Sequence, residues 1–209
     1  MHYYYFSHQG NVKNLLMGIL LEKQSEDLHI GVWEITESID ELRTLAKDSD
    51  DSHLNLEKRK KEFLSTRLLL QHMIQIKEID YNKDGSPKIN HKKEISISHS
   101  DNLSCIILSE KRNGIDIQTI KRKSLNISSK FINPHHIKDL TKEKATLIWT
   151  MKESIFKWHK IKSVNFKEDI IIPEFKIEKQ GCVITEFKGD HIRCNYLKIQ
   201  DKYLSYVCN

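Results

Sequence analysis

The sequence predicts an α+β fold, in which blocks of helices and strands follow one another without the regular alternation of a βαβ chain. Three observations lead to this prediction. Two long segments have apolar residues at the helical period, short strand patterns fill the middle and the end of the chain, and a turn-rich stretch separates these blocks. We place a boundary near Lys111, because 1–111 and 112–209 then each hold a helical part and a strand part.

The N-terminal half contains strand patterns, two helix patterns and a pronounced turn. Ser38 precedes apolar residues at the helical period, as a helix cap does. Asn82–Pro87 combines Asn, Asp, Gly and Pro, the residues that favour a turn. The expected elements are an edge strand at Tyr3–Phe6, a strand or short helix at Val12–Leu21, a strand at Ile30–Ile35, and helices at Ile39–Leu45 and Leu56–Ile74.

Three short strands follow the turn as a hairpin or meander, and strands return at the end of the chain. Between them, Pro134 is expected to begin a short helix, and Thr141 opens a longer one that runs to about His159. The expected strands are Glu94–His99, Leu103–Leu108, Asn113–Gln118, Ile170–Ile172, Phe175–Glu178, Cys182–Phe187, His191–Ile199 and Tyr203–Cys208.

The composition predicts a folded, cytoplasmic chain. Of the 209 residues, 38% are hydrophobic and 30% are charged, which is a globular balance and not a disordered one. The four cysteines form no C-x-x-C pair, so we expect reduced thiols and no structural zinc. The apolar run Leu15–Leu21 is too short for a bilayer and lacks the features of a signal peptide. The net charge of +5 suits a phosphate-rich ligand, an acidic protein or nucleic acid.

Asp116 is the first candidate for chemistry. It lies between Ile115 and Ile117 in an expected strand, so its side chain shares a face with that of Gln118. Two oxygen-bearing side chains at this spacing can reach one hard cation. The alternative is that both residues belong to the solvent-facing side of an exposed strand.

The segment Trp149–Lys157 is the second candidate. Glu153 and Lys157 are four residues apart, which places them on one face of the expected helix, one turn after Trp149. The pair fits a metal-binding carboxylate beside a phosphate-binding ammonium group. It also fits an ordinary salt bridge that stabilises the helix by about a few tenths of a kcal/mol.

A Ser-His-Ser cluster, Ser98–Ser100, ends the strand before the hairpin. Its hydroxyl, imidazole and backbone N–H groups can bond to phosphate oxygens. Ser98 and His99 are poorly placed as a nucleophile and its base, because adjacent residues of a strand point apart. The alternative is an ordinary strand end.

The three segments, taken together and in this order, resemble the signature of the 4′-phosphopantetheinyl transferases of the surfactin-synthetase-activating type. The resemblance spans about Leu56 to Lys157 and rests on Ser98–Ser100, Gly114–Asp116 and the spacing Trp149-x-x-Lys152-Glu153-Ser154-x-x-Lys157. Phe131 also falls where that family carries a phenylalanine.

This resemblance implies a pseudo-dimer of two similar α+β lobes, with the active site in the cleft between them. It implies an enzyme that transfers the 4′-phosphopantetheine arm of coenzyme A to a serine of an acyl or peptidyl carrier protein. Mg²⁺ would be the cofactor, and 3′,5′-ADP the other product. Both lobes lie in one chain, which favours a monomer.

The family's roles carry over onto the matching positions. Asp116 and Glu153 would bind Mg²⁺, and Glu153 is also a candidate base for the carrier serine, directly or through water. Lys157 would contact the phosphate under attack. Lys152 would contact a phosphate or the carrier.

The coenzyme A contacts implied by the resemblance come from the N-terminal half. Ser98 and His99 would hold the 3′-phosphate end of coenzyme A. Arg59 and Arg67, on the basic helix, are further candidates for phosphate contacts.

The sequence departs from the family pattern at two positions. Many relatives carry an acidic residue two places after the aspartate, where this chain has Gln118; an amide oxygen can still bind the metal, but without charge, so we expect weaker Mg²⁺ binding. Relatives also often carry a lysine just before the turn proline, where this chain has Ser86. Lys83 or Lys88 would then replace that contact.

Two other classes of function compete with an active transferase. Gln118 and Ser86 motivate a non-catalytic module that binds coenzyme A or a carrier protein on the same fold. The basic runs Lys58–Lys61 and Lys121–Lys123 motivate nucleic-acid binding, but no nucleic-acid-binding motif accompanies them. We therefore expect neither nucleic acid nor membrane as a partner.

Overall fold

The computed structural model describes residues 2–5, 18–133, 135, 137–160 and 163–209. The fold is α+β, and the chain divides into two compact units, Met1–Lys111 and Arg112–Asn209. No helix in the described ranges has the length and apolar character needed to cross a membrane. Each unit contains a five-stranded antiparallel sheet and one 18-residue helix.

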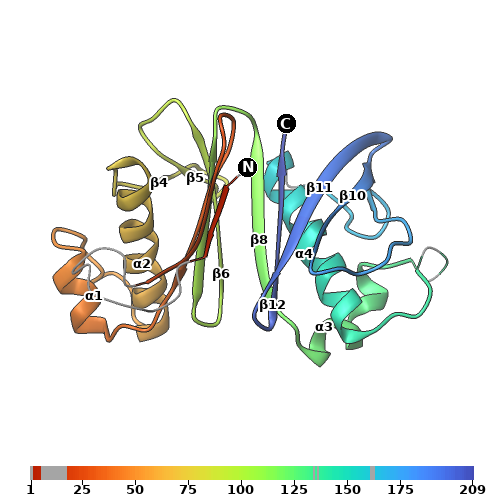
Figure 1. The fold of residues 1–209 in the computed structure, drawn as a ribbon, viewed down its shortest axis with the longest axis horizontal. Coiled ribbons are helices and arrows are strands. Elements are labelled where there is room, and N and C mark those ends of the chain that lie inside the picture. Colours follow the sequence, from red (N-terminus) through yellow and green to blue (C-terminus); the bar gives the residue numbers. More distant parts are fainter. Residues whose placement is uncertain (1, 6–17, 134, 136, 161–162) are drawn as a thin grey trace. The chain divides into compact units, whose positions relative to one another are not determined.

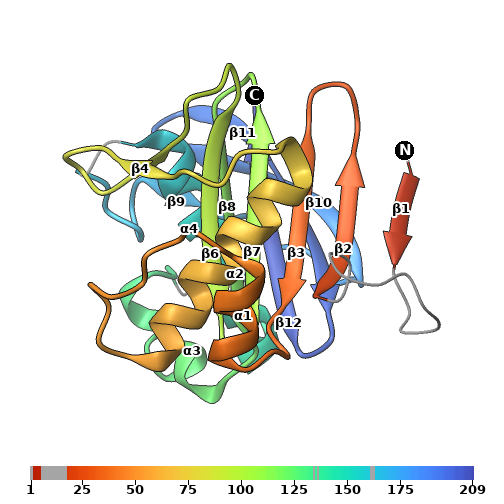
Figure 2. The ribbon, with the colours of Figure 1, turned by 90° about the vertical axis from the view of Figure 1, so that its left-hand side faces the viewer.

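The N-terminal unit is built on a sheet with the strand order β1-β2-β3-β7-β6. Figure 2 shows its two helices packed in front of this sheet. A small two-stranded ribbon, β4–β5, flanks the turn at Asn82–Pro87. The elements are β1 His2–Tyr5, β2 Ile19–Gln24, β3 His29–Glu34, α1 Ile39–Leu45, α2 Glu57–Ile74, β4 Asp80–Tyr81, β5 Pro87–Lys88, β6 Glu94–Ser100 and β7 Leu103–Ser109.

The core of this unit forms because both helices turn apolar side chains to the sheet. Ser38 and Glu41 form a capping box that satisfies free N–H groups at the start of α1. In α2, Leu64, Leu68 and Leu69 are buried against the sheet, although the helix is polar on its other side. Burying such a leucine side chain contributes about 1.5–3 kcal/mol.

The C-terminal unit is built on a second sheet, with the strand order β8-β12-β11-β10-β9. Figure 1 shows α4 lying along this sheet. The hydroxyl of Thr141 caps α4 by accepting a hydrogen bond from the N–H of Lys144. The elements are β8 Asn113–Thr119, α3 Arg122–Asn126, a 3-10 turn Ser128–Lys130, α4 Lys142–His159, β9 Ile170–Ile171, β10 Gln180–Phe187, β11 Asp190–Ile199 and β12 Lys202–Cys208.

Most of the elements expected from the sequence are confirmed to within about two residues, among them both long helices. The strand expected at Phe175–Glu178 is wrong. Phe175 and Ile177 pack against the core, which explains the alternating pattern, but the N–H of Glu178 donates to the hydroxyl of Tyr196. The expectations for residues 12–17 and for a helix starting at Pro134 lie outside the described residues.

The two units share one local arrangement. A strand leads through a long helix to a hairpin, and the second hairpin strand pairs antiparallel with the first strand: β3, α2, β6 and β7 in one unit, and β8, α4, β11 and β12 in the other. In both, a glycine of the first strand faces the helix. A Cβ added to Gly31 would touch Leu69 and Met73, and one added to Gly114 would touch Ser154 and Trp158.

The two glycines differ in how closely the helix approaches. At Gly31 the nearest atoms belong to side-chain ends, Leu69 Cδ1 and Met73 Sδ, each 2.8 Å from the added Cβ. At Gly114 they are backbone atoms of α4, the carbonyl oxygen of Ser154 at 2.1 Å and the nitrogen of Trp158 at 2.5 Å. Side chains can shift, whereas a helix backbone cannot move without displacing the whole element.

We therefore expect Gly114→Ala to destabilise the protein by more than about 3 kcal/mol, and Gly31→Ala by about 1 kcal/mol or less. Thermal unfolding of both variants beside the wild type measures the difference. Gly31→Ala is the matched control, since it makes the same change at the corresponding strand position. Equal losses in the two variants would contradict the close backbone contact at Gly114.

Candidate active site

The strand β8 turns alternate residues toward α4. Gly114 contacts α4 directly, so Asp116 and Gln118, at i+2 and i+4, share that face. Asp116 is only 2% exposed, and Ile115 and Ile117 on the other face are fully buried. The alternative of a solvent-facing strand surface is therefore wrong for Asp116.

Asp116 lies at the centre of a small polar network. The ammonium of Lys157 donates to Asp116 Oδ1 at 2.7 Å and to the carbonyl oxygen of Ile115 at 3.0 Å. The amide of Gln118 donates to Asp116 Oδ2 at 3.0 Å. The ion pair of Lys157 therefore joins α4 to β8. It differs from the alternative expected from the sequence, a salt bridge between Lys157 and Glu153 within the helix.

Glu153 lies beside this network on α4. Burial and, as a smaller cause, the negative charge of Asp116 raise the pKa of Glu153 to about 7, and the nearby Lys157 partly opposes both effects. When Glu153 is ionised, the two carboxylates outnumber the one ammonium group, and the site carries net negative charge. Such an arrangement favours a cation.

The side-chain oxygen atoms of this site are of the type that binds Mg²⁺. Asp116 and Glu153 supply carboxylates and Gln118 an amide, and hard divalent cations prefer oxygen ligands. Within the described ranges, no group of three or more His, Cys, Asp or Glu side chains is arranged to hold a metal. The candidate set therefore consists of two carboxylates and an uncharged amide.

The structure places Ser98 and His99 at the end of β6, where His99 contacts α2 of the N-terminal unit. His99 Nε2 is 2.7 Å from the hydroxyl of Thr66, whose own proton is donated to the carbonyl oxygen of Glu62 at 2.6 Å. The hydroxyl has one proton, so His99 Nε2 must be the donor to it. Ser98 is 6% exposed.

The predicted basic contacts also belong to the N-terminal unit. Arg59 is 63% exposed and pairs with Glu62 at 2.7 Å. Arg67 lies over the ring of Phe63, 3.3 Å from its centroid, and burial lowers its pKa, although Tyr81 opposes this. Lys83 is exposed in the turn before β5. Arg67 and Thr66, the partner of His99, are thus neighbours on α2.

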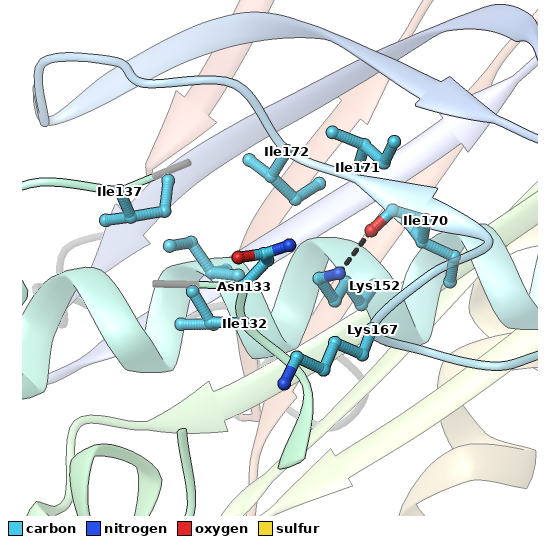
Figure 3. Close-up of a pocket in the computed structure, with 9 residues that line it drawn as sticks. Ile132, Asn133, Ile137, Lys152, Lys167, Ile170, Ile171 and Ile172 are labelled. Carbon is cyan, nitrogen blue, oxygen red and sulfur yellow. Dashed lines mark hydrogen bonds between the residues drawn. The ribbon is translucent and has the colours of Figure 1, made fainter. Parts of the chain in front are cut away.

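Lys152 does not lie with Glu153 and Lys157. Lys152 is 3% exposed, and its ammonium donates to the carbonyl oxygens of Phe166 and Ile170. Lys152 lines a small pocket of about 10 Å³ together with Asn133 and Lys167 (Figure 3). Burial lowers the pKa of Lys152 to about 8. The predicted contact with a phosphate or carrier protein is therefore not supported by its position.

Two polar residues that contact residues of the predicted motifs, one in each unit, were missed by sequence reasoning. Thr66 orients His99, and no pattern in α2 distinguishes it from other buried polar residues. Ser205, opposite Asp116 on β12, donates to Ser154 of α4 at 3.1 Å and adds a second polar link between sheet and helix. Both depend on pairings that only the fold creates.

The same strand and helix positions in the N-terminal unit carry different residues. Counting from the two glycines, Trp33 corresponds to Asp116, Leu68 to Glu153 and His72 to Lys157. Trp33 and Leu68 belong to the hydrophobic core. The two carboxylates therefore occur at this place in one unit only.

Comparison with known proteins adds no family assignment. A scan against protein-family models finds no match, and a search of curated proteins finds no similar sequence.

The raised pKa of Glu153 predicts a stability effect with a definite sign. The folded chain holds the proton of Glu153 to higher pH than the unfolded chain, so stability is lost as the pH rises from about 4.5 through about 7. Glu153→Gln should therefore raise the thermal midpoint at pH 8 by an amount equivalent to up to about 3 kcal/mol, and change it little at pH 4.5.

Glu143→Gln, on the same helix, is the control. Hydrogen bonds from Lys198 and Tyr203 lower the pKa of Glu143, so its loss should reduce stability at pH 8. A Glu153→Gln variant that is less stable than the wild type at pH 8 would contradict the assigned environment.

Proposed function

We propose that this protein is a Mg²⁺-dependent 4′-phosphopantetheinyl transferase. It moves the phosphopantetheine arm of coenzyme A to a serine of an acyl or peptidyl carrier protein and releases 3′,5′-ADP. The observation that carries the proposal is the joining of Gly114–Asp116 and Glu153–Lys157, far apart in sequence, into one buried polar site. These are the segments that resemble the transferase signature.

In this reaction, the protein contributes positioning and stabilisation of negative charge, and it forms no covalent intermediate. The serine oxygen forms a bond to the phosphorus that carries the pantetheine arm, and the bond from that phosphorus to 3′,5′-ADP breaks. When bound by Asp116 and Glu153, Mg²⁺ would neutralise the charge that builds on the departing phosphate. Lys157, held by Asp116, presents a fixed ammonium to the phosphate under attack.

The serine proton needs an acceptor. Glu153 is the candidate, directly or through a water molecule, because its burial beside Asp116 raises its affinity for a proton. Metal binding lowers that affinity, which favours transfer through water. Glu153 would thus hold the cation and receive the proton from the carrier serine.

The proposal extends to the coenzyme and to the arrangement of the units. Ser98 and His99 would bind the 3′-phosphate end, with Arg59, Arg67 and Lys83 as further contacts. We propose a monomeric pseudo-dimer with its active site in the cleft between the lobes. The shared strand, helix and hairpin arrangement of the two units supports the internal similarity. A cytoplasmic location fits the four cysteines, which form no disulfide within the described part of the chain.

A non-catalytic binding module is the second candidate, and Gln118 is the observation that favours it. Its amide donates to Asp116, so the third position of the site brings no negative charge. Such a protein would bind coenzyme A or a carrier without transferring the arm. The transfer assay separates the two functions.

Incubation with coenzyme A, Mg²⁺ and a panel of apo-carrier proteins should raise the mass of at least one carrier by one phosphopantetheine group. Asp116→Asn should reduce the rate at least about 100-fold. The isosteric amide removes the negative charge that would bind the metal and that forms the ion pair with Lys157. Asp190→Asn, at an exposed position of β11, is the control and should keep full activity. Coenzyme A binding without any mass gain would instead indicate the binding module.

Gln118→Glu should restore a third carboxylate and lower the Mg²⁺ concentration needed for half-maximal activity by about tenfold. Titration of activity against Mg²⁺ measures this. Gln180→Glu makes the same change at an exposed position of β10 and should leave the Mg²⁺ requirement unchanged. An unchanged requirement in Gln118→Glu would exclude residue 118 from the metal site.

A further inference from the structure

The helix α4 divides its motif residues between two faces. Gly114 and Asp116 of β8 meet Ser154, Trp158 and Lys157 on one face. Trp149, Lys152 and Phe156 follow at spacings of three and four residues and define the other face. That second face contacts the segment after the helix, and Phe166 of that segment lies 5.4 Å from Trp149 and 5.5 Å from Phe156 between ring centroids.

The segment Asn165–Ile170 is a compact turn with its own hydrogen bonds. Asn165 Oδ1 accepts from the N–H of Lys167 at 2.9 Å and of Glu168 at 3.3 Å. The N–H of Asp169 donates to the carbonyl oxygen of Asn165 at 2.8 Å, and the N–H of Asn165 donates to Asp169 Oδ2 at 2.9 Å. The sheet holds the end of this turn, because Ile170 of β9 pairs with Phe187 and the N–H of Lys188 donates to the carbonyl oxygen of Asp169 at 3.0 Å. What remains is an attachment of the turn to α4.

Lys152 supplies that attachment. Its buried ammonium donates to two carbonyl oxygens of the turn, those of Phe166 and Ile170, and Figure 3 shows the second of these bonds. The charge of Glu168, also on the turn, acts on Lys152, whereas Asp116 and Lys157 are the charges that act on Glu153. Lys152 is thus directed away from the carboxylates, although it is adjacent to Glu153 in sequence.

We propose that Lys152 is a positioning residue that ties the Asn165–Ile170 turn to α4, and not a ligand for the phosphates of the substrate. The tie holds Phe166 between Trp149 and Phe156, which flank Glu153 along the helix. It thereby keeps Glu153 and Lys157 turned toward Asp116. This effect on Glu153 and Lys157 rests on the proposed function.

The attachment of the Asn165–Ile170 turn to α4 can be tested without substrate. Lys152→Met keeps most of the side-chain volume but removes the ammonium, and hydrogen exchange of the full-length protein reports on the turn. We expect at least about tenfold faster exchange in residues 165–170, since two charged hydrogen bonds are lost. Lys167→Met is the control, because Lys167 lines the same pocket and no described residue of α4 accepts a hydrogen bond from its ammonium. Equal exchange in the two variants would overturn the proposal.

The test against a ligand role uses coenzyme A itself. The dissociation constant of coenzyme A, measured by calorimetry, should stay within about twofold in Lys152→Met, and in the transfer assay kcat should fall about tenfold with KM for coenzyme A unchanged. A tenfold weaker affinity for coenzyme A would overturn the proposal. If the wild type binds no coenzyme A, the proposed function fails, and hydrogen exchange alone decides the role of Lys152.

A measurement on the wild type covers the case in which Lys152→Met does not fold. Amine-reactive labelling should modify Lys167 readily and leave Lys152 unmodified, with or without coenzyme A, because Lys152 is buried. Fast labelling of Lys152 that coenzyme A suppresses would show a ligand contact and overturn the proposal.

Discussion

The candidate active site depends on the close approach of α4 to β8 at Gly114. No other residue leaves room there for the carbonyl oxygen of Ser154 and the nitrogen of Trp158. This approach lets Lys157 reach across to Asp116, and it places the carboxylate of Glu153 beside the same buried aspartate. A side chain larger than hydrogen at residue 114 would force the helix away from every polar group that it brings to the strand.

The two carboxylates of the site, Asp116 and Glu153, lie in different electrostatic environments. Asp116 is fully buried and is satisfied by the ammonium of Lys157 and the amide of Gln118. Glu153 is nearby without such a partner, and burial raises its pKa. Ionised Glu153 is stabilised when a cation binds, and protonated Glu153 is the favoured form without one. This is how its raised pKa is related to the proposed metal binding and proton transfer. In the N-terminal unit the corresponding positions are apolar or histidine, so that unit lacks this feature.

A single helix carries both the chemical and the supporting residues of the motif. Glu153 and Lys157 belong to the site, whereas the neighbouring Lys152 bonds to carbonyl oxygens of the Asn165–Ile170 turn. The helical period separates them, because adjacent residues point about 100° apart. A short stretch of one helix therefore carries side chains with two different sets of contacts, which only the fold distinguishes.

The sequence by itself determined the α+β class, both long helices and most strands, because these depend on local period and on capping. It also singled out Asp116, Glu153 and Lys157 through their residue types and spacing. Only the tertiary structure decided how these residues pair. The partner of Lys157 is Asp116, 41 residues away, and Lys152 bonds to backbone carbonyls that no side-chain pattern marks. Pairings across elements depend on the packing of helix against sheet, which local sequence does not encode.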